Sequence, residues 1–405
     1  MMAVGPSRVV DLFSGGGGMS CGFYAHPTFE LAGAVDVEIG KPSTGHGALG
    51  CNATYAENLK ITPLSLDLSD TSADEVDEAL LTSGGGRPEI LLACPPCTGF
   101  SRAVSKNWAQ DDPRNSLVAH VADHVAQMRP RILMMENVPQ LLSGNFRYHF
   151  AALRSNLEAM GYKVHASSHI LSRFGLPQQR ERAVVIAVDQ DLPLHTLDDL
   201  WHGYQVKPEA VTVRRAIDNL PAVETGETHP DDQNHTSTML KGESLARIKA
   251  IPVNGGGWPD LLGNPDTEKY LIPSMWKAVR AGRLNSYCDV YGRMYWDRPA
   301  PTIKRECSHV GNGRYSHPQQ NRQCTVRELG ILQGFPSDYR FVGASRKNLY
   351  RQIGDAVPPL ISYQLAWVAD WILTANKPDI AQIILPGTTL QVEDLIPTNS
   401  QLTFI

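Results

Sequence analysis

The sequence lacks long hydrophobic runs, and no stretch approaches the roughly 18–20 uninterrupted apolar residues that a membrane helix requires. Its N-terminus, MMAVGPSRVVDLF, lacks a charged segment followed by an apolar one, so we expect no export signal. Cysteine is scarce: the chain has seven, and an odd number leaves at least one thiol free. These absences argue against a disulfide framework and a membrane protein, and they predict a cytoplasmic one.

The sequence also lacks an excess of basic residues, since 37 Lys and Arg stand against 42 Asp and Glu, a net charge of −5. Bulk charge therefore does not favour a protein that coats nucleic acid, but it does not exclude a local basic groove. Residues 276–327 carry ten Lys and Arg and three acids, a net charge of +7. On charge alone, this segment is either a solvated surface or a site of phosphate contacts.

Short apolar runs alternate with helix-length segments over the first 190 residues. The apolar runs predict buried strands at Arg8–Phe13, Leu31–Asp36, Glu89–Ala93, Ile132–Met135 and Ala183–Val188. The segments between them predict helices that include Ser72–Leu81, Ser116–Met128 and Phe146–Met160. This alternation indicates an α/β fold with a doubly wound, mostly parallel sheet that is covered on both faces. Ligands of such sheets bind beyond the C-terminal ends of the strands.

The regular pattern ends near residue 190, so we expect the chain to divide there. Residues 1–190 predict the first domain, and residues 191–340, with their proline, glycine and polar clusters, predict a smaller irregular one. Residues 341–378 contain a helical pattern at Leu360–Leu373 that is expected to pack back on the first domain. Residues 379–405 form a C-terminal tail, apolar enough for strand or extended structure.

Four consecutive glycines follow the first predicted strand, in the sequence VVDLFSGGGGM. Because glycine has no Cβ, the backbone there can approach a ligand closely. The spacing is neither that of a phosphate loop nor that of a dinucleotide fingerprint. The second predicted strand ends at Asp36, where a carboxylate can accept hydrogen bonds from a ribose. A nucleoside cofactor without a pyrophosphate fits this pattern better than NAD does, and a plain glycine turn is the alternative.

Cys97 follows another predicted strand, in LLACPPCTGFS, directly after two prolines that restrict the backbone. A nucleophile would be displayed at such a position. Cys94 and Cys97 also form a Cys-x-x-Cys sequence, which occurs in redox pairs and as half of a zinc site. The chain has no second cysteine pair at zinc spacing. Nucleophile, redox or metal pair, and buried structural cysteine are the three interpretations.

Charged side chains lie near the ends of the last two predicted strands. Glu136, in MMENVPQLL, stands beside apolar residues in a setting that suits proton donation, and an acid held in a cap is the alternative. Arg180 and Arg182 are two residues apart in FGLPQQRER on an expected extended segment, so they face the same way. Two such guanidiniums either hold a carbonyl or phosphate group or pair with surface acids.

Taken in order, these motifs resemble those of the cytosine C5 DNA methyltransferases. The shared motifs are DLFSGGGG, CPPC followed by FS, DPRNSL, ENV, PQQRER, RPAPTI, TVRELGILQGFP and YRQIGDAVPP. They extend from residue 9 to about residue 370 in the family's order and spacing. Each motif is weak alone, but eight in the same order are specific.

The resemblance implies three catalytic roles. Cys97 matches the cysteine that attacks C6 of a flipped cytosine, and Glu136 matches the acid that binds or protonates N3. Arg182 matches the arginine that holds O2, with Arg180 nearby. Addition of the thiolate makes C5 a nucleophile, which takes a methyl group from S-adenosyl-L-methionine and leaves S-adenosyl-L-homocysteine. The resemblance implies no metal.

The resemblance also implies the cofactor site. Phe13 would pack on adenine, Asp36 would bind the ribose, and Asp67 would pair with the adenine amino group. The full set of implied cofactor residues is Phe13, Ser14, Gly15, Gly16, Gly18, Asp36, Val37, Asp67, Leu68, Pro96, Leu117, Asp355 and Ala356. One of them departs from the family, which usually reads I-G-N-A-V where this chain has Asp355. A carboxylate there would favour the sulfonium cation or repel the carboxylate end of the cofactor.

The implied partner is double-stranded DNA, whose target base must be flipped out of the helix. Residues 191–297 match the target-recognition region, and their length favours a sequence-specific reader; residues 276–327 are the candidates for phosphate contacts. We expect a monomer near the nucleoid, with no membrane association and with a cognate restriction endonuclease as a separate partner. The alternatives are a tRNA cytosine C5 methyltransferase and a catalytically silent DNA-binding relative. Relatives of the silent kind lose the cysteine or the ENV acid, and this chain has both.

Overall fold

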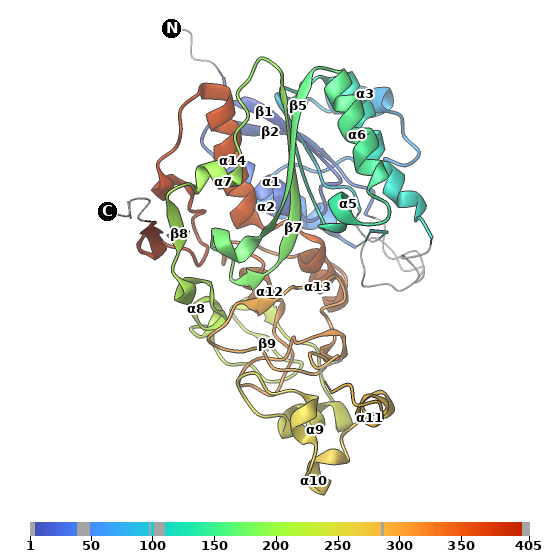
Figure 1. Ribbon diagram of the computed structural model, residues 1–405, viewed down its shortest axis with the longest axis vertical. Helices are drawn as coiled ribbons and strands as arrows, with labels where there is room; N and C mark the ends of the chain where they lie inside the picture. The colour runs from blue at the N-terminus through green and yellow to red at the C-terminus, as the bar shows by residue number, and fades with distance from the viewer. Residues whose placement is uncertain (1–4, 39–48, 97–98, 101–109, 285–286, 399–405) are drawn as a thin grey trace, which may run out of the picture.

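The computed structural model describes residues 5–38, 49–96, 99–100, 110–284 and 287–398. Its centre is a six-stranded sheet with the strand order β2-β1-β3-β4-β7-β5 (Figure 1). The strands are β1 Ser7–Leu12, β2 Phe29–Val35, β3 Ile90–Ala93, β4 Ile132–Asn137, β5 Tyr162–Ile170 and β7 Glu181–Asp189. β1, β2, β3 and β4 are parallel, and β7 runs antiparallel to both β4 and β5. The predicted mostly parallel sheet is confirmed.

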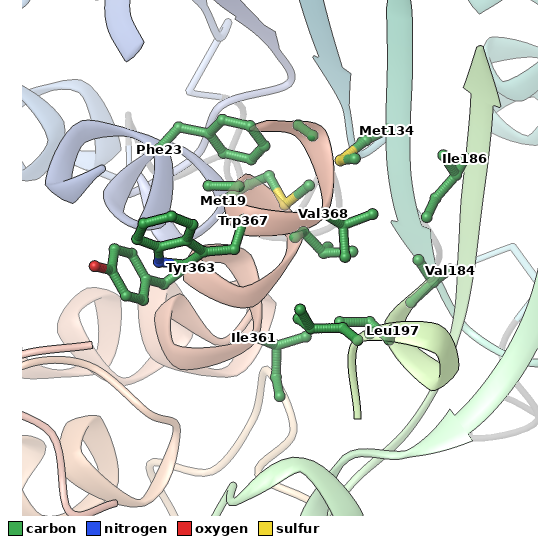
Figure 2. Close-up of a cluster of buried hydrophobic side chains, with 14 of the residues drawn as sticks. Met19, Phe23, Met134, Val184, Ile186, Leu197, Ile361, Tyr363, Trp367 and Val368 are labelled. Atoms are coloured by element: carbon green, nitrogen blue, oxygen red, sulfur yellow. The ribbon is translucent and has the colours of Figure 1, made fainter. Parts of the chain in front are cut away.

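Helices cover both faces of the sheet because successive strand residues point to opposite faces. Val10 and Leu12 belong to one buried cluster with residues of α3, α4 and α6, whereas Val9 belongs to a second cluster with α1, α7 and α14. The covering helices are α1 Gly18–Ala25, α3 Ala73–Thr82, α4 Leu117–Met128, α6 Tyr148–Ala159, α7 Leu197–Leu200 and α14 Pro359–Thr374. Figure 2 shows the second cluster, in which side chains from β4, β7 and α7 meet those of α1 and α14.

The α1 and α14 helices approach each other more closely than side chains of ordinary size permit. Gly22 of α1 faces the backbone of Ser362 and Tyr363, and a Cβ at Gly22 would overlap these backbone atoms. The Ser362 hydroxyl donates a hydrogen bond to the carbonyl oxygen of Met19. A helix from the end of the chain therefore completes the core around the first helix.

A second lobe extends below the sheet in Figure 1 and contains α9, α10 and α11. Its buried cluster includes Ile248, Trp258, Met275 and Tyr291. The elements of this lobe and of its borders are β6 Gln178–Gln179, β8 Tyr204–Val206, α8 Val213–Ile217, β9 Thr228–His229, β10 Asp232–Thr236, α9 Gly242–Ala250, α10 Pro265–Glu268, α11 Pro273–Arg280 and β11 Ala300–Pro301. Most of these elements are short, as the proline and glycine clusters predict.

The remaining elements are α2 Cys51–Leu59, α5 Gln140–Ser143, α12 Val326–Leu332, α13 Arg346–Asp355 and β12 Leu395–Pro397. Three of them, α2, α12 and α13, share a buried cluster that connects the two lobes, whereas α5 packs on the sheet and β12 pairs with β8. One buried cluster contains Tyr55 of α2 together with Leu329 of α12 and Tyr350 of α13. The predicted division of the chain at residues 190, 340 and 378 stays a prediction, and this cluster extends across the first two of these boundaries.

The predicted strands and helices of the first domain match the observed ones within two residues at each end. The expected helix Leu360–Leu373 is confirmed as α14, and it packs on the first domain as predicted. In the tail, β12 pairs antiparallel with β8. The nine-residue strand β5 was not among the predicted elements. Among the described residues, no helix is long and apolar enough to cross a membrane.

Candidate active site

The C-terminal ends of β1, β2, β3 and β4 meet at one edge of the sheet. In the register of the strands, Leu12 lies opposite both Val35 and Ala93, and Leu92 lies opposite Met134. The residues that follow these positions are the glycine loop, Asp36, the CPPC segment and Glu136. Four motifs that are far apart in the sequence therefore lie side by side, as expected for a ligand site of a parallel sheet.

The glycine loop is bonded directly to Asp36. The Gly15 amide donates to Asp36 Oδ2 over 2.9 Å, and the Glu38 amide donates to Oδ1 over 2.7 Å. Gly15 has a φ of +51°, which favours glycine, and its missing Cβ points into open space. Burial raises the pKa of Asp36, while the two amides and Arg305 oppose that rise. The result is a carboxylate held rigidly beside an open glycine surface.

The other side of the glycine loop is packed against the protein. Gly17 has a φ of +83°, and a Cβ there would lie 2.7 Å from Leu59 Cδ1 and 2.8 Å from the Tyr339 hydroxyl. That hydroxyl donates to the carbonyl oxygen of Gly16 over 2.6 Å. On the loop itself, the Ser14 hydroxyl is buried and has no hydrogen-bond partner among the described residues. A rigid loop with a free hydroxyl and one open face fits a polar nucleoside ligand.

Glu136 lies at the C-terminal end of β4 and faces two arginines. Its Oε1 atom is 2.9 Å from Arg182 Nε and 3.9 Å from Arg180 Nε. All three side chains are nearly buried, and within the described part of the chain Glu136 Oε1 accepts no aligned hydrogen bond. The expected common orientation of Arg180 and Arg182 is therefore observed. Both guanidiniums meet the same carboxylate instead of surface acids.

The two arginines differ in their other bonds. Arg180 donates to the carbonyl oxygens of Ile303 and Ala356 over 3.1 Å each, and its side chain is 2% exposed. Arg182 donates to its neighbour's carbonyl, at Glu181, and its side chain is 12% exposed. Arg180 thus connects the site to two distant segments, and Arg182 is the one that is open to a ligand.

Cys97, the expected nucleophile, lies outside the described residues, as do residues 39–48. The two prolines before Cys97 are described. The side-chain amide of Asn137 donates to the carbonyl oxygen of Pro95 over 3.1 Å. Asn137 directly follows Glu136 and is buried. The end of β4 therefore holds Pro95, two residues before Cys97, through the Asn137 side chain.

The structure joins the other expected cofactor residues less tightly. Asp36 donates its amide to the Leu64 carbonyl over 3.0 Å, which holds the segment that leads to Asp67 and Leu68 beside the end of β2. Asp67 accepts from Ser69, and Leu117 begins α4. Among the described residues, no hydrogen bond or ion pair connects Asp67, Leu117 or Pro96 to the glycine loop. Phe13 has a φ of +61°, an unusual value for a residue other than glycine, at the point where β1 enters the loop.

Asp355, the residue that departs from the family pattern, ends α13 and forms an ion pair with Arg305. The distance from Arg305 Nη1 to Asp355 Oδ2 is 2.5 Å. Burial of the carboxylate by the surrounding protein raises the pKa of Asp355 to about 6, although Arg305, Arg180 and Arg351 all oppose the rise. The side chain is nonetheless 37% exposed, so it lies in a recess that solvent can enter.

Several residues of this site were missed in the sequence. Glu38 accepts the Asn52 amide over 2.7 Å beside Asp36, and Asn137 and Tyr339 fix the backbone as described above. Arg305 is the fourth. None of them stands out in the sequence, because each acts on a segment that is distant along the chain. The ENV and QGFPSDY motifs, which contain Asn137 and Tyr339, were the available signals.

The expectation that residues 276–327 contact phosphates is wrong for several of their bases. Arg293 donates to four carbonyl oxygens and to Asn321, Arg322 pairs with Glu328, and Arg327 pairs with Asp232. These three side chains are buried and cannot contact phosphates. Arg314, bonded to Asp289, is nearly buried as well. The exposed bases, which stay candidates, are Lys277, Arg280, Arg283, Arg298 and Lys304.

A mostly parallel sheet with a glycine loop after β1 and an acid after β2 defines the fold of methyltransferases that use S-adenosyl-L-methionine. A family model described as C-5 cytosine-specific DNA methylase matches residues 7–368. The chain belongs to this enzyme family.

Similar proteins agree with this assignment. The Type II methylase M.HgiDII of Herpetosiphon aurantiacus is 32% identical over 367 residues, which cover 88% of this chain and 93% of that protein. The Type II methyltransferase M1.HphI of Haemophilus parahaemolyticus is 31% identical, over 88% of this chain and 85% of that protein.

Solved structures share the fold. A putative DNA modification methyltransferase encoded within an E. coli prophage has a TM-score of 0.58 at 21% identity and covers 91% of this chain and 99% of its own. The S. pombe Dnmt2 methyltransferase has a TM-score of 0.54 at 17% identity, over 90% of this chain and 98% of its own.

Proposed function

We propose that the chain transfers a methyl group from S-adenosyl-L-methionine to C5 of cytosine in a specific double-stranded DNA sequence. The observation that carries this proposal is the Glu136 carboxylate, facing Arg182 at 2.9 Å, on the same sheet edge as the Gly15–Asp36 cradle. An acid and a guanidinium side by side match the N3 and O2 atoms on one edge of a cytosine ring. The cradle supplies the nucleoside site next to it.

In the proposed reaction, the Cys97 thiolate adds to C6 of the flipped base. Glu136 delivers a proton to N3 as the C5–C6 double bond opens, so that the ring does not accumulate negative charge. Arg182 stabilises the electron density on O2, and Arg180 keeps Arg182 and Glu136 in place. C5 then carries the electron pair that forms the new carbon–carbon bond. A solvent base takes the C5 proton, the C5–C6 double bond re-forms as the thiolate leaves, and N3 returns its proton to Glu136, which restores the ring.

S-adenosyl-L-methionine would supply an electrophilic methyl group on a sulfonium centre. The residues that would hold it are Asp36 at the ribose, Phe13 at the adenine, and Ser14 with the neighbouring glycines at the methionine part. The unpartnered Ser14 hydroxyl and the open face of Gly15 support this placement. Asp67, Leu68, Leu117 and Pro96 complete the proposed pocket.

The second lobe is the proposed target-recognition region. Its exposed bases Lys277, Arg280 and Arg283 lie on and just after α11, and they are suited to the phosphates of the DNA. We further propose that the chain acts as a monomer and that a restriction endonuclease of the same specificity acts separately.

Covalent trapping tests the proposed chemistry without knowledge of the target sequence. A long amplicon in which 5-fluorocytosine replaces cytosine is incubated with the protein and the cofactor. Fluorine at C5 cannot leave as a proton does, so a DNA–protein adduct that survives denaturation is expected. Cys97→Ala should give no adduct, and an adduct that forms equally with Cys97→Ala would refute the proposed nucleophile. An adduct with RNA alone would move the substrate to tRNA.

A further inference from the structure

Asp355 and Arg305 form a partly exposed ion pair at the place where the family usually has an uncharged asparagine. The 2.5 Å contact joins the last residue of α13 to the segment that follows β11. The side chains are 37% and 25% exposed, so the pair borders a solvent-accessible space. An acid in this position thus comes with a base that neutralises it.

The backbone around the pair is held in place by independent contacts. Gly354 packs directly against the backbone of Lys304 and Arg305, and a Cβ at Gly354 would overlap it. Arg180 donates to the carbonyl oxygens of Ile303 and Ala356, which flank the two partners. The side-chain amide of Gln333 also donates to the carbonyl oxygen of Ala356, over 2.7 Å. Because both segments are fixed, the pair is a defined feature of the site and not a chance surface contact.

The residues that follow Asp355 pack directly against the glycine loop, since a Cβ at Gly18 would lie 3.0 Å from Ala356 Cβ and would overlap the carbonyl oxygen of Val357. Burial raises the pKa of Asp36, which is hydrogen-bonded to the same loop, and Arg305 opposes that rise. Burial raises the pKa of the Cys51 thiol, at the start of α2, and Asp36, Asp355 and Glu38 raise it further, whereas Arg305 opposes the rise. Arg305 therefore acts on Asp355, on Asp36 and on the Cys51 thiol, whereas Arg180 and Arg351 also act on Asp355.

We propose that Arg305 is a positioning residue of the cofactor pocket, which cancels the charge of Asp355 and thereby sets how the pocket distinguishes the charged cofactor from its product. This inference rests on the proposed function. S-adenosyl-L-methionine carries one positive charge more than S-adenosyl-L-homocysteine, because the product has lost the sulfonium. The ratio of the two affinities therefore reports the electrostatic potential of the pocket.

Each partner alone should shift this ratio in an opposite direction. Arg305→Gln leaves Asp355 without its ion-pair partner, so binding of the cofactor is strengthened relative to the product by about fivefold, in the range of coupled charges. Asp355→Asn leaves Arg305 without its partner, so the ratio falls by a similar factor. The double variant removes both charges and should return to the wild-type ratio.

Isothermal titration calorimetry tests the expected ratios. S-adenosyl-L-methionine and S-adenosyl-L-homocysteine are each titrated into the wild-type protein, the two single variants and the double variant. Arg305→Lys should keep the wild-type ratio, since it keeps the charge, and it covers the case in which Arg305→Gln does not fold. Arg214→Gln is the matched control, because it breaks an exposed Arg–Asp pair, Arg214–Asp297, in a different part of the molecule.

Unchanged ratios in folded Arg305→Gln and Asp355→Asn would overturn the inference and leave the proposed function intact. A double variant whose ratio stays shifted from the wild-type value would also overturn it. A wild-type protein that binds neither ligand would instead contradict the proposed function itself. A structural role alone would weaken both ligands equally and would not move the ratio.

Discussion

Glu136 is a nearly buried carboxylate whose Oε1 faces two guanidiniums and accepts no aligned hydrogen bond from a described residue. The ion pair with Arg182 offsets the burial of this carboxylate, and a ligand that hydrogen-bonds to it would satisfy it further. The proposed ligand is the N3 edge of a cytosine. The role of Glu136 is therefore expected to concern catalysis as well as stability.

Glu136→Gln should lower kcat by about 10²–10³-fold, because the amide keeps the size of the side chain but cannot deliver a proton. The melting temperature should fall as well, because Arg182 and Arg180 lose the charge that they face. The measurement is steady-state methylation of DNA with labelled cofactor. Glu57→Gln, which alters an exposed acid paired with Arg340, is the control and should keep the wild-type rate. A wild-type kcat in Glu136→Gln would contradict the assignment.

Glu328 predicts a pH dependence of stability. Arg322 binds both of its carboxylate oxygens, over 2.7 and 2.8 Å, and the Thr325 amide binds one of them as well. Although burial opposes them, these partners lower the pKa of Glu328 to about 2 from 4.5. Because the pKa is lowered on folding, the contribution is present above pH 4.5 and is lost as the pH falls toward 2.

Urea unfolding of wild type and Glu328→Gln measures this contribution. At pH 7 the variant should be less stable by on the order of 3 kcal/mol, since Arg322 loses its buried partner. The difference should shrink as the pH falls below about 4.5. A difference that stays constant from pH 7 to pH 3 would show that the ionised pair does not stabilise the fold.

At the scale of elements, the contact between α1 and α14 decides whether Gly22→Ala raises or lowers the free energy of unfolding. Alanine in a helix is usually more stable than glycine by about 1 kcal/mol. At Gly22, however, the added Cβ would overlap the backbone of α14, and overpacking of this kind costs about 1–3 kcal/mol or more. We therefore expect Gly22→Ala to lower the free energy of unfolding.

Chemical denaturation of Gly22→Ala beside Gly5→Ala checks this expectation. Gly5 has nothing within 4 Å of its built Cβ, so its substitution should be neutral. A Gly22→Ala protein as stable as wild type would mean that α14 does not pack on α1 as closely as described.

The predictability of the elements follows from where their side chains lie. β1, β3 and β4 are buried on both faces, so they appear in the sequence as continuous apolar runs. β5, with the sequence YKVHASSHI, is an edge strand with only two buried residues, and its polar pattern gave no strand signal. α1 begins inside the glycine run, which indicates a turn, and its helical structure depends on α14.

The residues of the candidate site also divide into those that the sequence could predict and those that it could not. Gly15, Asp36, Glu136 and Arg182 could be predicted because each belongs to a motif at a strand end. The Arg305–Asp355 pair could not, because it joins residues that are 50 positions apart and depends on the path of the chain between them. The burial of Arg293, Arg322 and Arg327 was equally hidden, since charge counting treats every base as exposed.

At the scale of the whole molecule, the exposed bases of the second lobe predict salt-dependent binding to DNA. Each phosphate contact contributes a slope of about −0.9 to log K against log salt. Replacing Lys277, Arg280 and Arg283 by glutamine should therefore reduce the slope by about 3, as measured by fluorescence anisotropy. Arg87 lies just before β3, at the end of the sheet opposite to the candidate active site. Arg87→Gln should therefore leave the slope unchanged. An equal slope in the triple variant would place the DNA elsewhere.

The central claim is that the chain makes 5-methylcytosine in DNA through Cys97. Nucleoside mass spectrometry on DNA and RNA tests it most directly, in cells that have no C5 methylation of their own and that express either the wild-type chain or Cys97→Ala. We predict 5-methylcytosine in the DNA of cells with the wild-type chain and none with Cys97→Ala. Unmethylated DNA from cells that contain the folded wild-type protein, or methylation in RNA alone, would contradict the account.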